Sequence, residues 1–330
     1  MKRHWIALSL ALCLLPGMLL PAHADEKRVR KYEAYVIQDT VLREKTKGKG
    51  QVASIKEGTK VAVYELGDTW SYVSGKGDKG YIKTKCLARF RSLNAMKYPV
   101  PRRTVNAGII TFTQETRITG GKFGGLTAKG GTMVCVTEAN EKNYRLAVWR
   151  GTGKLDRSRG DYWAFTPWEE AQPGDLIGGF TTYYNAKTGA PRAKERAYNI
   201  SLACQRIHND VIKPGKTYSF NRHCGPYSQG GKYQLAPNIS QKGVGYGGGV
   251  CQVSTTLYNA VLGLPLQVDA VQVHRKSGVN YIPQWFDSAV GPFSDLKFTN
   301  LLHYPIRLWA QPQGGALTVL IYRAEESDPA

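Results

Sequence analysis

The chain has 330 residues, 42% of them hydrophobic, and a formal net charge of +20. This length and hydrophobic content favour two or three folded domains and exclude a chain that is too polar to build a core. The basic excess favours polyanionic partners, but no nucleic-acid-binding motif accompanies it. We therefore expect cell-wall polymers, acidic lipid headgroups or peptidoglycan carboxylates, and no nucleic acid.

The first 24 residues are predicted to be a secretory signal peptide. Lys2 and Arg3 precede an apolar stretch from Trp5 to Leu20, and Ala22-His23-Ala24 is a cleavage site of the small-x-small kind. No later segment is long and apolar enough to span a bilayer. We expect an exported protein, periplasmic or in the cell wall or extracellular space, cleaved near Ala24 and without a stable membrane span in its mature form. Loss of Lys2 and Arg3 lowers the net charge from +20 to +18.

Residues 25–32 are rich in charge and are predicted to form a flexible lead. Residues 33–92 contain short runs of alternating apolar and polar residues, such as Lys60–Tyr64 and Trp70–Val73, which are separated by glycine-containing turns. This alternation is typical of half-buried strands, and short strands at this spacing predict a small β-barrel.

The sequence of this region resembles a bacterial Src-homology-3-like (SH3-like) domain. The resemblance implies a module that binds cell-wall peptides or glycans. Trp70 and Tyr81 either contact such a ligand or fill the interior of the barrel. The matching segments are Val41-Leu42-Arg43, Ile55–Val61, Trp70–Val73 and Lys79–Ile82.

A weaker second copy is predicted for residues 104–172, after a proline-containing basic linker at residues 93–103. Gly131–Val136 is similar to Gly58–Val63 at an offset of 73 residues, and two later segments keep a similar spacing. A repeated spacing of this kind predicts an internal duplication, and hence a possible second SH3-like β module.

Residues 173–312 form a third predicted domain, followed by a C-terminal strand and tail at 313–330. Apolar residues recur at three- and four-residue steps over 195–212, which predicts a helix that Lys213-Pro214-Gly215 ends. A strand is predicted over 217–221. Together the regions predict a multidomain chain, with small all-β barrels followed by an α+β domain.

The most informative segment of the third domain runs from Gly243 to Ala260. A glycine-rich loop becomes an apolar, helix-compatible stretch, and Cys251 lies at the junction. Glycine permits positive φ and close approach, while a helix N-terminus supplies unpaired N–H donors and partial positive charge. Both effects stabilise a thiolate and an oxyanion, so Cys251 is a candidate nucleophile. The alternative is a structural cysteine beside an ordinary turn.

Five cysteines remain after the predicted cleavage, and an odd count leaves one unpaired in an oxidising compartment. We predict disulfides Cys86–Cys135 and Cys204–Cys224, with Cys251 free. The alternative is that no cysteine is paired and that all are small core residues.

A series of ordered motifs runs through the third region. With the glycine–cysteine segment, these motifs make residues 174–310 similar to a VanW domain, a family named after an accessory product of some vancomycin-resistance clusters. The motifs are Pro173-Gly174-Asp175, Lys213–Asn221, Cys224-Gly225-Pro226, Gly231–Pro237, Tyr281-Ile282-Pro283, Asp295–Asn300 and Tyr304-Pro305-Ile306.

Some members of this family resemble a second class of L,D-transpeptidase, in which the cysteine of the glycine–cysteine segment is the nucleophile. The resemblance implies that Cys251 attacks the L-centre carbonyl of a donor stem peptide, that His274 is the base and that Asp287 orients the imidazole. The alternatives are a surface histidine and an aspartate in a turn. The predicted oxyanion and substrate loop consists of Gly247, Gly248, Gly249, Gln252 and Ser254.

The sequence departs from the family at two places. Lys276 replaces a frequent second histidine, and Trp285-Phe286 replaces a usual Gly-Arg, so a substrate-contacting arginine is missing there. We predict no cofactor and no metal, because the adjacent His223 and Cys224 lack a second ligand pair at zinc spacing. The other functional reading is a non-catalytic wall-binding accessory protein of the VanW type.

Overall fold

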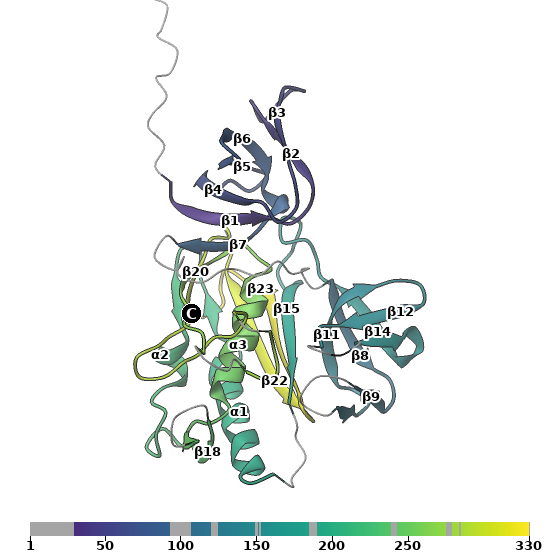
Figure 1. Cartoon of the computed structure of the whole chain (residues 1–330), viewed down its shortest axis with the longest axis vertical. Coiled ribbons are helices and arrows are strands. Elements are labelled where there is room, and N and C mark those ends of the chain that lie inside the picture. Colours follow the sequence, from purple (N-terminus) through teal and green to yellow (C-terminus); the bar gives the residue numbers. More distant parts are fainter. Residues whose placement is uncertain are drawn as a thin grey trace, which may run out of the picture.

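The computed structural model describes residues 30–92, 107–119, 125–148, 151, 153–184, 190–238, 243–274, 279–283 and 285–329. The predicted signal peptide, most of the predicted lead and the predicted linker at 93–103 lie outside these residues. The chain is multidomain and mostly β (Figure 1). An N-terminal β module and a second β module adjoin a C-terminal domain that contains the helices.

The N-terminal module has the strand order β7-β1-β4-β5-β6-β2-β3. The order is open, because β3 lies at the edge, and the predicted closed barrel is therefore not confirmed. Side chains alternate as expected on β5, where Ser71 and Val73 are buried between partly exposed neighbours. The strands are β1 (Tyr32–Val36), β2 (Thr40–Arg43), β3 (Gln51–Ile55), β4 (Lys60–Glu65), β5 (Trp70–Gly75), β6 (Asp78–Lys83) and β7 (Leu87–Ser92).

Neither of the two aromatic residues singled out in this module is fully buried. Lys83 Nζ lies 4.2 Å from the centre of the Trp70 ring, and Arg43 Cζ lies 5.5 Å from it. Tyr81 packs edge-on against Tyr72 at 5.1 Å. Both therefore lie on the partly exposed surface rather than in the core.

The second module has the strand order β13-β12-β11-β8-β14. This order corresponds strand for strand to β6-β5-β4-β1-β7, and the 3₁₀ turns at Thr84–Cys86 and Arg157–Arg159 are 73 residues apart. A duplication accounts for both observations. The strands are β8 (Gly108–Phe112), β9 (Thr116–Ile118), β10 (Leu126–Ala128), β11 (Met133–Ala139), β12 (Asn143–Leu146), β13 (Lys154–Asp156) and β14 (Gly160–Ala164).

A shared sheet joins the N-terminal module to the C-terminal domain. Strand β7 pairs in parallel with β20 (Leu266–Ala270) where Arg91 faces Val268, so a single ten-stranded sheet runs through both. The Arg89 N–H group also donates to the Leu262 carbonyl at 3.1 Å. Arg89 and Arg91 are both buried at this junction. The module is thus attached through backbone hydrogen bonds as well as side chains.

The C-terminal domain is built on a second, antiparallel sheet of order β15-β23-β22-β16. Helices α1 and α3 pack on it, and α3 lies in the middle of the domain (Figure 1). The elements are β15 (Leu176–Tyr183), α1 (Ala193–Ile207), β16 (Val211–Ile212), β17 (Thr217–Ser219), α2 (Phe220–Cys224), β18 (Leu235–Pro237), β19 (Val244–Tyr246), α3 (Val250–Val261), β20, β21 (Lys297–Asn300), β22 (Ile306–Gln313) and β23 (Ala316–Arg323).

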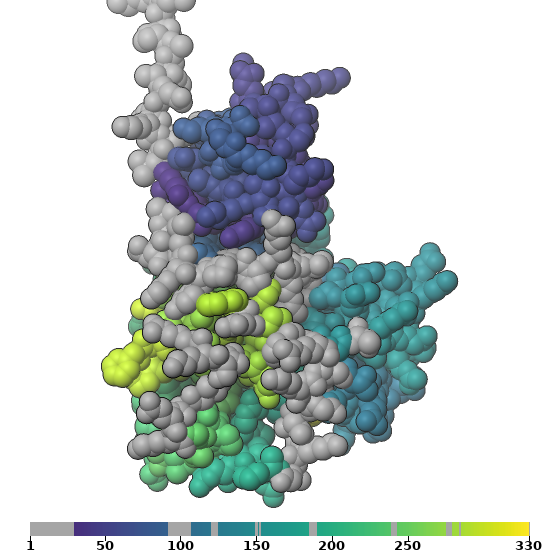
Figure 2. Space-filling view, in the orientation of Figure 1, coloured from purple at the N-terminus to yellow at the C-terminus, as the bar shows by residue number. Residues whose placement is uncertain are grey.

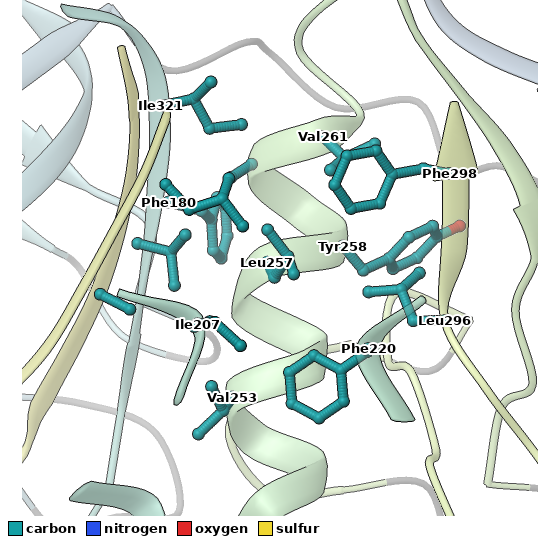
Figure 3. Close-up of a cluster of buried hydrophobic side chains, with 14 of the residues drawn as sticks. Phe180, Ile207, Phe220, Val253, Leu257, Tyr258, Val261, Leu296, Phe298 and Ile321 are labelled. Carbon is teal, nitrogen blue, oxygen red and sulfur yellow. The ribbon is translucent and has the colours of Figure 1, made fainter. Parts of the chain in front are cut away.

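Helix α3 is buried on nearly all sides, and its apolar residues form the centre of the core. Val253, Leu257 and Val261 lie among side chains from α2, β15, β21 and β23 (Figure 3). Every residue of α3 is buried except Cys251. A helix with this pattern is held by its surroundings rather than by its own propensity, so its N-terminus is a fixed position in the fold.

Three predicted boundaries in this domain differ from the structure. Helix α1 ends at Ile207 rather than 212, because Asn209 adopts a left-handed conformation (φ 69°) and Val211–Ile212 pairs with β22. The predicted strand stops at Ser219, whose Oγ accepts the Arg222 N–H and begins α2. The predicted boundary at 312 falls inside β22, and β23 beyond it is an inner strand of the sheet.

The predicted disulfides do not form, since all five described cysteines are free. Cys86 lies in the core of the N-terminal module, whereas Cys135 packs with Ile109 and Leu320 in a different cluster, so the Cys86–Cys135 prediction was wrong. Cys204 and Cys224 share one core as thiols, and Cys224 Sγ lies 3.7 Å from the Ala203 carbonyl oxygen.

The three parts meet around a cavity of about 530 Å³. Lys85 lines it from the N-terminal module, Trp168 from the segment before β15, and Leu264 from the segment after α3. In the space-filling view the second module projects from the side of the C-terminal domain (Figure 2). In the described residues, no helix is both long and apolar enough to cross a membrane.

Candidate active site at Cys251

The glycine loop before α3 is held by close contacts that only glycine permits. Gly249 is the residue before the helix and has φ +106°, and a Cβ there would lie 3.0 Å from Arg196 Cγ and from Ile200 Cγ1. A Cβ on Gly248 would lie 2.5 Å from the carbonyl oxygens of Ala236 and Pro237. The glycines thus let the loop lie directly against α1 and β18.

The buried Asn199 of α1 fixes the loop by hydrogen bonds. Its Nδ2 donates to the carbonyls of Gln234 (2.9 Å) and Gly248 (3.1 Å), and its Oδ1 accepts the Gln234 N–H at 2.8 Å. The side-chain amide therefore satisfies backbone groups that the irregular loop leaves unpaired. The N-terminus of α3 is rigid as a result.

We predict that Gly249→Ala lowers the free energy of unfolding by about 2–4 kcal/mol, because backbone strain and overpacking add. Gly174→Ala is the matched control, since Gly174 has φ +89° and a Cβ added there would have no other atom within 4 Å. The control should lose only the strain contribution, about 1–2 kcal/mol. Urea denaturation of both variants measures the difference, and equal losses would contradict the close packing at Gly249.

Cys251 is the second residue of α3 and is partly exposed. Its sulfur lies 3.5 Å from both the N–H nitrogen and the carbonyl oxygen of Val290. The sulfur therefore lies at the helix N-terminus, open to solution on one side and bounded by the 286–290 segment on the other. This position matches the predicted placement of the thiol.

His274 and Asp287 lie together beside this sulfur. Asp287 is fully buried, and its Oδ2 accepts hydrogen bonds at 2.7 Å from both the backbone N–H and the Nδ1 of His274. Nδ1 is thus occupied, which leaves Nε2 as the nitrogen of the ring that is directed to other partners. The structure brings Cys251, His274 and Asp287 into one hydrogen-bonded group.

Polar side chains of α3 hold the segment that carries Asp287. Ser254 Oγ donates to the Ser288 carbonyl at 2.7 Å, Thr255 Oγ1 accepts the Ser288 N–H at 2.9 Å, and Asn259 Nδ2 donates to the Phe286 carbonyl at 2.8 Å. The residues on both sides of Asp287 are therefore bound to the helix that carries Cys251. These hydrogen bonds fix the position of the Asp287 carboxylate relative to the helix.

The electrostatics of the group favour a charged imidazole. Burial alone lowers the pKa of His274, but its hydrogen bonds to Asp287 and Cys251, and the charges on both, raise it to about 9. In contrast, burial raises the pKa of Cys135 to about 12. The imidazolium is therefore held beside both the Asp287 carboxylate and the sulfur of Cys251.

The raised pKa predicts a pH-dependent contribution to stability. A histidine whose pKa rises on folding stabilises the protein fully below its unfolded value near 6.5, and this contribution is lost as pH rises through about 9. We expect His274→Gln to lose about 2–3 kcal/mol relative to wild type at pH 6 and much less at pH 10. Urea unfolding at both pH values tests this, and a constant difference would contradict it.

The other predicted loop residues have structural partners. The Gly247 N–H group donates to the carbonyl of Gln234, just before β18, at 3.3 Å, and the Gly248 N–H group donates to that of Gly245 at 3.4 Å. Gln252 is 1% exposed, and Ser254 is fully buried. Among the described residues, the Gly249 and Cys251 N–H groups donate to no backbone carbonyl outside the helix. These two are the candidate oxyanion donors that the geometry favours.

Sequence reasoning missed two residues near the sulfur, Arg196 of α1 and Tyr281. Burial lowers the pKa of Arg196 and raises the pKa of Tyr281, and the charge of Cys251 acts on both groups. Arg196 Nη2 donates to Gln252 Oε1 at 2.7 Å. The one available signal was that Arg196 and Asn199 are three residues apart and so share a face of α1.

The other histidines among the described residues lie elsewhere. His208 Nδ1 is 3.1 Å from the Ala310 carbonyl oxygen, His223 pairs with Asp210, and His303 with Asp68. Lys276 lies outside the described residues. Within the parts of the chain that the structure describes, no three His, Cys, Asp or Glu side chains gather into a group that could hold a metal ion.

Comparison with known proteins gives a family match to most of the C-terminal domain. Residues 195–322 match a family model described as VanW like protein. The match covers less than half of the chain and includes Arg196, Cys251, His274 and Asp287. The C-terminal domain therefore contains a VanW-type region, in agreement with the resemblance of the motifs.

A curated relative and a solved structure were also compared. The uncharacterized protein YoaR of Bacillus subtilis (strain 168) is 36% identical over 154 residues, which are 45% of this chain and 48% of that protein. The chain thus spans about half the length of this relative. A crystal structure of an NlpC/P60 family protein from Bacillus cereus ATCC 10987 aligns over 90% of this chain and 100% of its own, with 10% identity and a TM-score of 0.17.

Proposed function

We propose that this protein is an exported cysteine acyltransferase of the cell wall, and specifically an L,D-transpeptidase that acts on peptidoglycan stem peptides. The observation that carries the proposal is the hydrogen-bonded group of Cys251, His274 and Asp287 at a partly open helix N-terminus. A nucleophile, a base and an oriented carboxylate in this order support acyl transfer. The VanW-type region around them supports the wall as the location.

The first half-reaction forms a thioester. The Cys251 thiolate attacks the carbonyl carbon of the L-centre residue in a donor tetrapeptide, and the oxyanion is stabilised by the N–H groups at the start of α3. His274, as imidazolium, gives its proton to the nitrogen of the terminal D-alanine as the C–N bond breaks. Free D-alanine leaves, and the acyl group remains on the sulfur.

The second half-reaction forms the cross-link. Neutral His274 removes a proton from the amine of an acceptor stem peptide as that amine attacks the thioester carbonyl. The C–S bond breaks, the new amide forms, and the thiolate and imidazolium are restored. Asp287 keeps Nδ1 protonated throughout, so Nε2 always faces the reacting atoms.

The two β modules supply the proposed attachment to the wall. Trp70 is partly exposed, and the cations of Arg43 and Lys83 lie over its ring. Such a surface suits glycans and anionic wall polymers. Binding there raises the local concentration of stem peptides at Cys251.

Incubation of the mature protein with disaccharide-tetrapeptide, followed by mass spectrometry, tests the function. We expect release of D-alanine and the appearance of cross-linked dimers. Absence of both products would contradict the proposal that the protein is an enzyme. If sacculi still bound the protein in a sedimentation assay, the chain would instead be a non-catalytic wall-binding accessory protein.

A further inference from the structure

Arg196 lies where the glycine loop meets α3, next to the proposed nucleophile. It is in the first turn of α1, and its Cγ approaches the backbone of Gly249. Its Nη2 bonds Gln252, the residue that directly follows Cys251. A cation from α1 is thereby brought to the helix N-terminus that carries the sulfur.

The guanidinium is held in a fixed orientation. Gln252 Oε1 accepts one N–H, while Gln252 Nε2 donates to Thr182 Oγ1 at 3.0 Å and to the Tyr183 carbonyl at 3.3 Å. The Tyr184 ring lies 5.4 Å from Arg196 Cζ. Buried groups of β15 thus fix the Gln252 amide, and this amide in turn fixes the Arg196 guanidinium. A planar guanidinium held in this way is suited to binding both oxygen atoms of a carboxylate.

No carboxylate within 4.0 Å balances this charge among the described residues. The other arginines in ion pairs have an acidic partner: Arg30 has Glu33, Arg145 has Glu138 and Arg307 has Asp328. Arg196 makes one side-chain hydrogen bond, to a neutral amide, and the rest of its donors have no acceptor in the described part of the chain. The groups whose charges act on it are Tyr281, Tyr184 and Cys251.

Burial without a counter-ion is costly for a guanidinium, and here it lowers the pKa of Arg196. Five donors with one acceptor leave a binding position for an anion with two oxygen atoms. The partly exposed sulfur of Cys251 lies close enough for its charge to act on this guanidinium. An anion there would be close to whatever the thiolate attacks.

We propose that Arg196 forms a carboxylate-binding subsite beside Cys251. The identity of its ligand rests on the proposed function, in which the donor ends one residue beyond the attacked carbonyl. The carboxylate is then either the terminal α-carboxylate of the donor or a side-chain carboxylate of the residue under attack. In both cases the subsite selects a donor by charge and holds its carbonyl at the sulfur.

Alkylation with two small reagents tests the subsite without any peptide. Iodoacetate carries a carboxylate and iodoacetamide does not, and both react with the thiolate of Cys251, while the other four described cysteines are buried. We expect the iodoacetate-to-iodoacetamide rate ratio to fall about tenfold in Arg196→Gln, the loss of one charge-assisted contact. Rates are read by mass spectrometry of the Cys251 peptide in at least ~0.15 M salt, which screens remote charges.

Two further variants make the result specific. Lys194→Gln removes the same charge from an exposed position of α1 and should change the ratio less than about twofold. Arg196→Lys keeps the charge but loses the planar guanidinium, so its ratio should lie between those of wild type and Arg196→Gln. If Arg196→Gln fails to fold by circular dichroism, Arg196→Lys provides the test alone.

Two outcomes would overturn the proposal. If both reagents slow equally in a folded Arg196 variant, Arg196 acts only on the sulfur and not on a ligand. If Lys194→Gln changes the ratio as much as Arg196→Gln, the general positive charge of the protein is the cause.

Donor peptides then identify the source of the carboxylate. A tetrapeptide with a free C-terminus is compared with its C-terminal amide, and each is made with and without a side-chain carboxylate at the attacked residue. The carboxylate whose removal lowers kcat/KM in wild type but not in Arg196→Gln is the ligand. If the reagent ratio falls as expected and no peptide turns over, the subsite stands and the proposed transpeptidation fails.

Discussion

Replacing Cys251 by alanine should abolish acyl transfer, lowering the rate of D-alanine release by about a thousandfold or more. In the proposed mechanism this sulfur carries the acyl group, and no other described thiol is even partly exposed. Because Cys251 is the one residue of α3 that is not buried, the variant should keep the fold and the melting temperature. Mass spectrometry of the products and a thermal melt measure the two effects.

Cys224→Ala is the control for this experiment. Cys224 is fully buried in the core of the same domain, and burial raises its pKa far above the usual range. Its loss should lower stability by about 1–2 kcal/mol and leave the rate within a few-fold of wild type. Full activity in Cys251→Ala, or equal losses in both variants, would contradict a thioester on Cys251.

Asp287→Asn should lower the rate by about a hundred- to ten-thousandfold, because the amide no longer fixes the tautomer of His274. The same change removes a hydrogen bond and a charge that raise the pKa of His274 to about 9. The alkaline limit of activity should therefore move to lower pH by more than about one unit. A pH profile of kcat/KM separates this effect from a loss of folded protein.

Asp295→Asn is the matched control for the aspartate. Its carboxylate also accepts two hydrogen bonds, from Ser219 Oγ at 2.7 Å and from the Asn221 N–H at 2.9 Å, but it holds the start of α2 rather than the imidazole. It should lower stability and leave the pH profile unchanged. A profile that is also unchanged in Asp287→Asn would remove Asp287 from the catalytic group.

The part of the site that lies in one continuous segment was predictable from the sequence. Glycine followed by an apolar run indicates a loop entering a helix, and this local pattern alone located Cys251 at a helix N-terminus. His274 and Asp287 came from the resemblance to a family, since no spacing rule brings residues 23 and 36 positions downstream to one sulfur. The hydrogen bonds from Ser254, Thr255 and Asn259 that hold them were not foreseeable.

What depended on distant contacts was missed. The resemblance implied only that a substrate-contacting arginine is missing at 285–286, and it gave no sign that α1 supplies Arg196 from 55 residues before Cys251. The disulfide prediction failed because residue counts do not reveal that Cys86 and Cys135 lie in separate cores. The end of α1 at Ile207 follows from the pairing of β16 with β22, about a hundred residues later in the chain.

The pairing of β7 with β20 has a mechanical consequence. Many modular proteins join a binding domain to a catalytic domain by a flexible linker, and the length of the linker sets the volume that the catalytic domain can reach. Here the N-terminal module and the C-terminal domain share one sheet, so backbone pairing joins them directly. If the N-terminal module binds a wall polymer as proposed, the shared sheet would set the distance from that polymer to Cys251. The protein would then determine where along the polymer each new bond is made.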